Sequence, residues 1–497
     1  MISDKAFRKY DIRAIVDEEL PINDVYNLAQ AICAYFLSKK ENIKTIAVGM
    51  DIRTHSKAIK EELCKGIIDS GIDLIFIGEC ATPTLYFASK TENVDAAIMI
   101  TASHNNKEYN GLKILLENNS VWDQQIQEIR EIYKTYFDTY GSVKTSPYTP
   151  GLRQRLPTSS RLLRTGRRAQ QYDRSSHKGK YSEKNLVDKY LDFLSEKFVQ
   201  LKDKELNLII DCGNGCASLI IPKLVKNMNW KNVELLFDMP DGTFPNHDPD
   251  PTKEKNLTAL KKSVKNFHFG AALDGDCDRL AIMKNDGALI VGDELLTLFG
   301  LNLEKPGNIV YDIKCSNSLP TILEKREHKT YISATGHANI KDKMKETNAI
   351  LGGEISGHFC FKDRYFGYDD AIYALLRFIE IYLNNRDKNI FNFWPKHAST
   401  PELRLKCAKI DPQIIVDKSK KFFEEKHYKM ITIDGIRVES EKGWISLRAS
   451  NTEPVLSLRF EAQNEKELNN LKIILYDSIC QYVDQDLLRK EIELRTD

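Results

Sequence analysis

The stretch Thr45–Gly78, TIAVGMDIRTHSKAIKEELCKGIIDSGIDLIFIG, contains the pattern that decides the fold. Thr45–Asp51 is an apolar run that ends in a carboxylate, and Asp73–Gly78 is a second short apolar run. Between them, Ser56–Ser70 repeats its apolar residues with a helical period. The order strand, helix, strand favours two parallel strands joined by a crossover helix.

The same alternation recurs along most of the chain. Ala96–Ile100 is a third apolar run close to the first two. Later segments that repeat the alternation of strand and helix are Leu206–Asp211, Ala217–Asn227, Val233–Phe237 and Phe269–Asp274, then Asn308–Asp312, Leu319–Lys325, Thr330–Ala334 and Ile340–Thr347. The sequence therefore predicts three α/β domains in series, each with a largely parallel sheet flanked by helices.

After Pro401 the pattern changes to that of a smaller α+β domain. Ile414–Glu425 has a helical period, Met430–Val438, Gly443–Leu447 and Val455–Ala462 have the character of paired strands, and Glu465–Tyr482 is a closing helix. The predicted fold class is thus α/β, with three related α/β domains followed by a C-terminal α+β domain.

Size and charge limit the functions that are open to this chain. Its 497 residues are enough for three or four domains, and its net charge of +1 gives no global signal for nucleic acid or an anionic membrane. No apolar stretch approaches the length of a membrane span, and the charged start MISDKAFRKYDIR lacks a signal-peptide core, so a cytoplasmic location is expected. The ten cysteines are scattered, which predicts reduced thiols and neither disulfides nor zinc.

One segment breaks this composition. Thr145–Lys180 has no helical or strand period, is rich in arginine and contains one acidic residue, Asp173. The interpretations are a disordered linker or insertion, an arm that binds nucleic acid or an acidic partner, and a sequence artefact such as a shifted reading frame. A linker is the preferred interpretation. The segment Tyr181–Val199, which follows it, has a helical pattern and is predicted to begin the second domain.

Two polar loops follow predicted strands and carry catalytic residue types. The loop TASHNNKEYNGLK, Thr101–Lys113, presents Ser103 and His104 at the surface and ends in Lys113. The loop LDGDCDRL, Leu273–Leu280, carries Asp274, Asp276 and Asp278 at alternate positions, followed by Arg279. Three converging carboxylates repel one another unless a cation joins them, and Mg²⁺ prefers such oxygen ligands. An acidic surface turn is the alternative to a metal site.

Two further loops offer groups for binding a phosphorylated sugar. GGEISGH, Gly352–His358, places Glu354, Ser356 and His358 at alternate positions, which suits sugar hydroxyls or a capped turn. RASNTEP, Arg448–Pro454, combines a guanidinium group with short donors, which suits a phosphate or an ordinary turn. The short donors in this loop are Ser450, Asn451 and Thr452.

Taken in order with FRKYDIR, Phe7–Arg13, these loops resemble the motifs of the α-D-phosphohexomutases, in particular the bacterial phosphomannomutase/phosphoglucomutase type. The resemblance covers nearly the whole chain. It implies four domains around a central cleft, each contributing one loop. The domains expected on this basis are 1–146 with the phosphoserine loop, 147–180 as the arginine-rich linker, 181–290 with the metal loop, 291–400 with the sugar-binding loop, and 401–497 with the phosphate-binding loop.

The resemblance also implies a mechanism. Ser103 would carry a phosphoryl group, and Mg²⁺ would bind to that group and to the three aspartates. The group would pass to a hexose monophosphate to give a hexose 1,6-bisphosphate, which serves as intermediate and activator. Lys113, Arg13 and His358 are the candidates for proton transfer, and His104 would support the serine loop. The residues that would contact substrate are Tyr10, Arg279, Lys314, His337, Glu354, Ser356, Arg448, Ser450, Asn451 and Thr452; for Lys314 and His337 a structural role is the alternative.

The expected partners are small phosphosugars, in a monomer or weak homodimer that binds neither nucleic acid nor membranes. Two departures from the family pattern are Asn106, where proline is usual, and Ala14, where glycine is usual. The alternative functions are a phosphoglucosamine mutase, against which Ile355 argues, and a catalytically weak phosphosugar-binding relic, against which the intact serine and aspartates argue.

Overall fold

The structure, a computed structural model, describes residues 1–140, 178–386, 390–407, 410–450 and 454–494. These residues form two compact units. The first contains Met1–Phe193, Asn214–Ile220 and Met239–Asp248, and the second contains Leu194–Gly213, Ile221–Asp238 and Pro249–Asp497. Most of the arginine-rich segment, residues 147–177, lies outside the described residues.

The first unit contains a mixed seven-stranded sheet with the order β1-β5-β4-β2-β3-β7, in which β6 also pairs with β5. Strands β2, β3, β4 and β7 run parallel; at one edge β5 pairs antiparallel with β4, and β1 pairs antiparallel with β5. The strand bounds are β1 (Ile12–Ile15), β2 (Thr45–Met50), β3 (Asp73–Glu79), β4 (Ala96–Ile100), β5 (Tyr109–Leu116), β6 (Asn119–Ser120) and β7 (Tyr181–Glu183).

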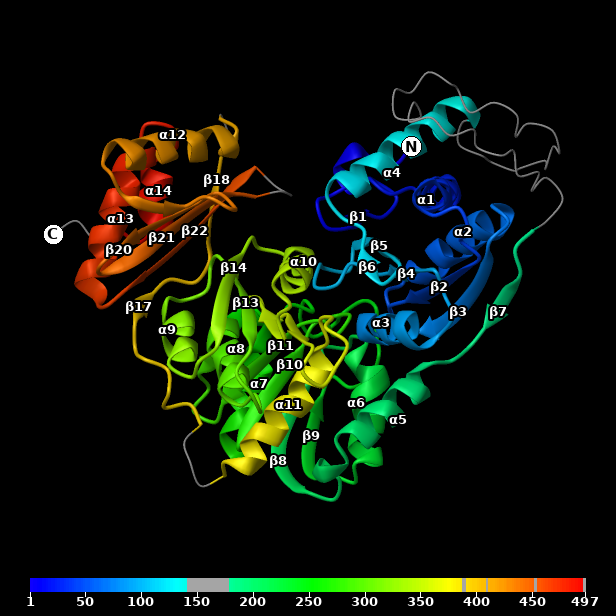
Figure 1. Cartoon of the computed structure of the whole chain (residues 1–497), viewed down its shortest axis with the longest axis horizontal. Helices are drawn as coiled ribbons and strands as arrows, with labels where there is room; N and C mark the ends of the chain where they lie inside the picture. Colours follow the sequence, from blue (N-terminus) through cyan, green and yellow to red (C-terminus); the bar gives the residue numbers. More distant parts are fainter. Residues whose placement is uncertain (141–177, 387–389, 408–409, 451–453, 495–497) are drawn as a thin grey trace. The chain divides into compact units, whose positions relative to one another are not determined.

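Helices cover both faces of this sheet (Figure 1). Helices α1 (Val25–Lys39), α2 (Ser56–Asp69) and α4 (Gln124–Tyr140) share one apolar core with the strands. Helix α3 (Thr82–Thr91) contacts β2 and β4 and contributes nothing to that core, so it covers the other face. Burial of a full apolar layer on each side explains why these strands are near-continuous apolar runs.

The second unit contains three sheets. Their orders are β12-β11-β10-β8-β9, β14-β13-β15-β16, and β17-β22-β21-β20-β19 with β18 paired to β22. The strand bounds are β8 (Glu205–Asp211), β9 (Lys231–Leu236), β10 (Phe269–Leu273), β11 (Leu280–Lys284), β12 (Leu289–Ile290), β13 (Asn308–Asp312), β14 (Lys329–Ser333), β15 (Leu351–Gly353), β16 (Phe359–Phe361), β17 (Ala398–Ser399), β18 (Leu403–Lys406), β19 (Lys429–Ile431), β20 (Ile436–Ser440), β21 (Gly443–Ala449) and β22 (Val455–Ala462).

The helices of the second unit pack on these sheets. The helix bounds, including α5 and α6 whose residues are divided between the units, are α5 (Val187–Lys197), α6 (Ala217–Asn227), α7 (Thr258–Ser263), α8 (Gly292–Leu301), α9 (Ser318–Glu324), α10 (His337–Thr347), α11 (Ala371–Asn384), α12 (Pro412–Glu425), α13 (Glu465–Ile479) and α14 (Gln485–Glu491). In the C-terminal part, α12, α13 and α14 cover one face of the antiparallel sheet and complete its own apolar core (Figure 1).

The structure confirms the predicted α/β class and corrects three segments. The helix predicted over Tyr181–Val199 begins only at Val187, because residues 181–183 pair as β7 with the edge of β3. The strand predicted over Met430–Val438 is two strands, because the chain turns before β20 through Gly435, which has φ of 69°. The last predicted helix, Glu465–Tyr482, ends at Ile479.

All ten cysteines fall within the described residues and are free thiols, as the sequence predicts. Eight of them are buried. Burial raises the pKa of Cys33 to about 12, so this thiol remains protonated and unreactive at neutral pH.

Candidate active site

The serine loop follows β4 and turns sharply at Ser103. This residue has a left-handed backbone with φ of 50°, and its amide donates to Thr101 Oγ1 at 2.9 Å. Ser103 Oγ lies 3.2 Å from His104 Nδ1, and the supporting role of that histidine stays a prediction. The expectation that Ser103 lies at the surface is wrong, because the residue is only 2% exposed.

Arg53, which the sequence analysis missed, determines the shape of this loop. Its guanidinium donates to the carbonyl oxygens of Ser103 (2.7 Å), Asn105 (2.6 Å), Asn106 (2.6 Å) and Tyr109 (3.1 Å). Arg53 is buried and pairs with Asp51, two residues before it. The Asn106 carbonyl is among these acceptors, so the residue that replaces the usual proline is itself held by hydrogen bonding. The available signal for Arg53 was its tripeptide Asp-Ile-Arg, which repeats the end of FRKYDIR.

Two predicted cations lie beside the serine loop in the first unit. Arg13 donates to Asn105 Oδ1 at 2.7 Å and pairs with Asp11. Lys113 is buried on β5, opposite Met99 of β4. Burial tends to raise the pKa of Asp11, but Arg13 and Lys113 outweigh it and lower that pKa. The carboxylate of Asp11 is therefore ionised beside both cations.

Tyr10 lies in the same unit. Its ring stacks on Trp122 with centroids 6.2 Å apart. The first unit therefore contains all five residues that were predicted on its loops, which are Tyr10, Arg13, Ser103, His104 and Lys113.

The metal loop, between β10 and β11, brings three carboxylates together. Single oxygens of Asp274, Asp276 and Asp278 lie within 4.8 Å of one another, and all three residues are buried. Asp274 Oδ1 accepts from the amides of Asp278 (3.0 Å) and Arg279 (3.1 Å), which closes the loop. Cys277 has φ of 65°, and this left-handed step turns the chain between two of the ligands. Three buried hard oxygen donors fit Mg²⁺.

The predicted sugar loop contacts the metal loop through His358. His358 Nε2 lies 3.3 Å from Asp278 Oδ1, and its Nδ1 lies 2.9 Å from Glu354 Oε2 and 3.0 Å from Ser356 Oγ. Arg279 Nε lies 3.3 Å from His358 Nε2. Burial lowers the pKa of His358, but the carboxylates of Asp278 and Glu354 outweigh it and raise the pKa to about 9.

His337 stacks on His358, with ring centroids 5.5 Å apart. Its Nδ1 lies 2.9 Å from Asp369 Oδ2, and Lys341 Nζ lies 2.9 Å from the other oxygen of the same carboxylate. Asp369 is fully buried and was missed in the sequence, where it precedes Asp370, the N-cap of α11. The adjacent capping residue gives an ordinary reason for acidic residues here, so the contacts of Asp369 with His337 and Lys341 could not be predicted from the sequence.

Lys314 lies between the sugar loop and the C-terminal part. Its amide donates to Asp312 Oδ1 at 2.6 Å, and Asp312 Oδ2 accepts from the amide of Ile355 at 2.9 Å. Its Nζ lies 2.7 Å from Glu402 Oε2. Asp312 therefore connects the segment that carries Lys314 to the segment that carries Glu354.

The predicted phosphate loop is described in part. Arg448 Nη1 lies 3.6 Å from Asp434 Oδ2, and that same oxygen accepts from the amide of Thr335 at 3.1 Å. The amide of Ser450 donates to the Val455 carbonyl at 2.9 Å. Asn451 and Thr452 lie outside the described residues. The second unit thus brings the metal, sugar and phosphate loops into one connected set of contacts.

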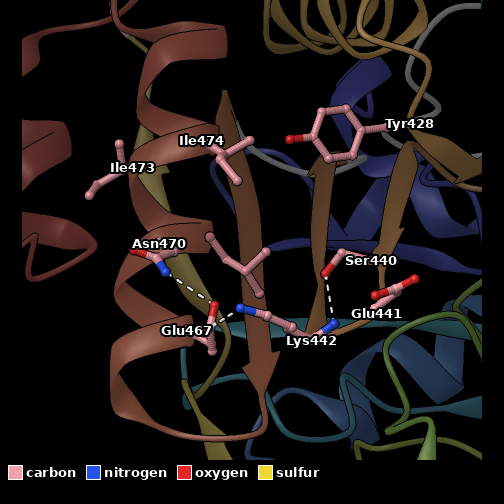
Figure 2. A pocket seen from close by; sticks show the side chains of 9 residues that line it. Tyr428, Ser440, Glu441, Lys442, Glu467, Asn470, Ile473 and Ile474 are labelled. Atoms are coloured by element: carbon pink, nitrogen blue, oxygen red, sulfur yellow. Dashed lines mark hydrogen bonds and ion pairs between the residues drawn. The ribbon is translucent and has the colours of Figure 1, made fainter.

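The C-terminal part also contains a shallow pocket lined by Tyr428, Ser440 and Lys442 (Figure 2). Lys442 Nζ lies 2.8 Å from Glu467 Oε1, so its charge is already paired. None of the predicted site residues lines this pocket. It carries no part of the candidate site.

Comparison with known proteins gives the same assignment along the chain. Four family models described as phosphoglucomutase/phosphomannomutase match successive segments. They are alpha/beta/alpha domain I over residues 4–139, alpha/beta/alpha domain II over 188–287, alpha/beta/alpha domain III over 291–394 and the C-terminal domain over 402–477. The class defined by fold and loops is thus that of the phosphohexomutases. The chain belongs to the phosphoglucomutase/phosphomannomutase family.

Individual relatives are similar over nearly their whole length. A phosphomannomutase/phosphoglucomutase of Pseudomonas syringae is 34% identical over 96% of this chain and 95% of its own. A phosphoglucomutase of Neisseria meningitidis is 34% identical over 94% of this chain and 95% of its own. A crystal structure of a family protein from Burkholderia thailandensis superposes with a TM-score of 0.82 at 29% identity, covering 97% of this chain and 98% of its own. Within the described residues, no helix is long and apolar enough to span a bilayer.

Proposed function

We propose that this phosphohexomutase interconverts hexose 6-phosphate and hexose 1-phosphate, with mannose, glucose or both as the sugar, in a reaction that depends on Mg²⁺. The observation that carries the proposal is the set of three buried carboxylates, joined through His358 to the hydroxyl and carboxylate groups of the sugar loop. Such a set is suited to a phosphorylated polyhydroxyl compound, because it provides both a cation site and acceptors for hydroxyl groups.

In the proposed reaction, Ser103 carries the phosphoryl group. A hydroxyl oxygen of the hexose monophosphate attacks the phosphorus of phosphoserine, the bond to Ser103 Oγ breaks, and a 1,6-bisphosphate forms. After the bisphosphate reorients, Ser103 Oγ attacks the other phosphate and the product hexose monophosphate leaves. Lys113 and Arg279, together with the metal, neutralise the charge on the transferred group, since such reactions are accelerated by positioning and charge neutralisation.

The three aspartates are the proposed ligands of Mg²⁺, which when bound supplies charge neutralisation at the phosphoryl oxygens. Arg13, Lys113 and His358 are the candidates for moving the proton of the reacting hydroxyl. We assign Glu354 and Ser356 to sugar hydroxyls that are common to both substrate orientations. The proposed ligands of the phosphate that does not react are Arg448, Ser450, Asn451 and Thr452; Tyr10, Lys314 and His337 are proposed as further substrate contacts.

The decisive experiment is a coupled assay that compares mannose 1-phosphate, glucose 1-phosphate and glucosamine 1-phosphate, with hexose 1,6-bisphosphate as activator. We expect turnover of the first two and little of the third. Preferred turnover of glucosamine 1-phosphate would show that the chain is a phosphoglucosamine mutase. No turnover of any of the three substrates would contradict the proposal. We further propose that the enzyme is cytoplasmic and consists of the four predicted domains. We also propose that it is a monomer or a weak homodimer, and light scattering of the purified protein tests this oligomeric state.

A further inference from the structure

The two faces of the C-terminal sheet are different in kind. On one face, β20, β21 and β22 contribute Val438, Ile445 and Phe460 to the apolar core. The opposite face carries two rows of residues paired in register across the same three strands, namely Arg437, Ser446 and Arg459 in one row and Glu439, Trp444 and Glu461 in the other. We call these six residues the polar face. The charged and aromatic residues of a solvent-facing sheet are normally exposed, yet here Arg437 and Trp444 are each 1% exposed.

The segment that covers the polar face is 313–317, directly after β13. Arg437 Nη1 donates to the carbonyl oxygens of Ile313 (2.5 Å) and Cys315 (2.6 Å), and Arg459 donates to the carbonyl oxygen of Lys314. The two remaining residues of the segment bond through their side chains. Ser316 Oγ donates to Glu461 at 2.8 Å, and Asn317 accepts from Arg437 at 2.6 Å and donates to Glu439 at 2.9 Å.

Trp444 fixes the two arginines that bind this backbone. The guanidinium carbons of Arg437 and Arg459 lie 3.9 Å and 5.4 Å from the centre of the Trp444 ring. The indole nitrogen donates to Glu461 at 3.0 Å, which sets the orientation of the ring. A planar guanidinium that stacks on an aromatic ring keeps its donors in a fixed plane, whereas a lysine in its place would not.

Five consecutive residues thus each form at least one hydrogen bond with the polar face. An ordinary packing interface between two parts of a protein involves side chains of several elements. Here, in contrast, the three hydrogen bonds to carbonyl oxygens all go to the backbone at Ile313, Lys314 and Cys315. The amide of Lys314 is held by Asp312 and its carbonyl by Arg459, so both peptide groups next to its side chain are fixed. The backbone that carries the Lys314 side chain is therefore bound by a residue of the C-terminal sheet, and its ammonium group is bound directly by Glu402 at 2.7 Å.

We propose that Arg437, Trp444 and Arg459 are positioning residues, which fix the backbone at 313–317 so that the Lys314 side chain is held in place for the substrate. The proposal rests on the proposed function, in which Lys314 is a substrate contact. It assigns to the C-terminal part a role in arranging a residue of the preceding domain, in addition to phosphate binding by its own loop.

The test is a double-mutant cycle between Arg437→Met and Lys314→Met in the full-length enzyme. Arg437→Met keeps the length of the side chain but removes the donors, and we expect it to lower kcat/KM by about 10- to 100-fold. In the Lys314→Met background the same change should cost less than about 2-fold, because the group that it positions is already absent. Equal losses in both backgrounds would overturn the proposal, since a purely structural role acts whether or not Lys314 is present.

Arg489→Met is the matched control. Arg489 also lies over an aromatic ring of the C-terminal part, 4.6 Å from the centre of Tyr476, and its Nε donates to the Tyr476 hydroxyl at 3.1 Å, but it is exposed and does not belong to the polar face. Activity should be unchanged in both backgrounds. If Arg437→Met does not fold, Arg459→Lys carries the same test, because it keeps the charge beside Asp293 and removes one of the two planar guanidinium groups beside Trp444, the one that donates to the Lys314 carbonyl.

Hydrogen exchange separates failure of this inference from failure of the proposed function. The amides of 313–317 should exchange at least about 10-fold faster in Arg437→Met than in the wild type, while β13 remains protected. This result does not depend on the substrate, so it would stand even if the wild type turned over no hexose phosphate. Unchanged exchange of 313–317 in a folded Arg437→Met protein would overturn the proposal.

Discussion

The serine loop and the metal loop are constructed in different ways. The backbone of the serine loop is bound by a distant residue, since Arg53 donates to carbonyl oxygens of four of its residues. The metal loop is closed by its own side chains, because Asp274 accepts from the amides of Asp278 and Arg279. The comparison teaches that the serine loop, which has a left-handed turn at Ser103, depends on an external donor, whereas the loop that gathers three carboxylates depends on the local spacing of its residues.

The largest expected effect tests the nucleophile of the serine loop. Ser103→Ala should lower turnover by at least about 10⁴-fold while the fold remains intact, because Arg53 binds the backbone of the loop and not the serine side chain. Intact-mass measurement should show a fraction of the wild type heavier by one phosphate, and no such fraction in the variant. Ser89→Ala, which removes a buried hydroxyl bonded to its own helix, is the control. Near-normal turnover of Ser103→Ala would exclude the phosphoserine mechanism.

The second prediction concerns the locally built metal loop. Chelation should abolish activity and added Mg²⁺ should restore it, and Asp276→Asn should lower kcat by about 100-fold or more and weaken the response to Mg²⁺. The measurement is turnover against Mg²⁺ concentration. Asp286→Asn changes an exposed acid that caps the following turn and should behave as the wild type. An enzyme that is indifferent to the chelator would contradict the metal assignment.

The third prediction tests the external donor itself. Arg53→Met leaves the carboxylate of Asp51 buried without its cation, so it should cost about 3–5 kcal/mol of stability. Because the serine loop loses four hydrogen bonds, turnover should also fall by about 100-fold. Thermal unfolding and kcat measure the two effects. If Arg53→Met retained full turnover below its unfolding temperature, the loop would hold its shape without the arginine, and the comparison would fail.

The fourth prediction is a pH effect at the contact between Lys314 and Glu402. Lys314 lowers the pKa of Glu402 below its usual value of 4.5, although burial opposes this. A lowered pKa in the folded state means that the unfolded chain binds the proton more readily as the pH falls. The stabilisation is therefore present above pH 4.5 and is lost as the pH falls below it.

Glu402→Gln should accordingly lower the free energy of unfolding by about 1 kcal/mol at pH 7. This cost lies between that of breaking an exposed ion pair and that of breaking a buried one. The difference from the wild type should shrink as the pH falls from 6 to below about 4. Thermal unfolding midpoints at several pH values measure it. Glu441→Gln, at an exposed glutamate of the same part, should show no such trend. A difference that grows in acid would reverse the assigned sign.

The smallest expected effect concerns the arginine-rich segment. Replacement of residues 145–177 by a short Gly/Ser linker should leave turnover within a few-fold, because a segment without an apolar period buries no face and loop closure depends weakly on length. Residues 178–183 are retained, since Gly179 and Lys180 bond to Ile68 and Asp73 and β7 pairs with β3. A replacement extended through Glu183 is the control and should destabilise the first unit. Loss of turnover with the shorter replacement would show that the composition was misinterpreted.

The comparison also explains which features the sequence could predict. The alternate spacing of Asp274, Asp276 and Asp278 is local, so the metal loop could be identified directly from the chain. Most strands and helices that were predicted from apolar periods lie within a few residues of the observed ones, whereas the helices α1, α4, α8 and α11 were not predicted. Arg53 was missed because its partners are distant in the chain. Asp369 was missed because its partner His337 is also distant and because it stands next to Asp370, the N-cap of α11. The short strand β7 was missed because its only support is pairing with the edge of β3, which no local period reveals.

The contacts of the polar face have a consequence for how the protein is made. Ile313 and Lys314 leave the ribosome 124 and 145 residues before Arg437 and Arg459, the arginines that bind their carbonyl oxygens. A nascent chain that stops short of β22 therefore ends before the second of these donors has been translated. The segment at 313–317 acquires its full set of bonds only after Arg459 has been translated, so a product truncated before β22 lacks the hydrogen bond to the Lys314 carbonyl.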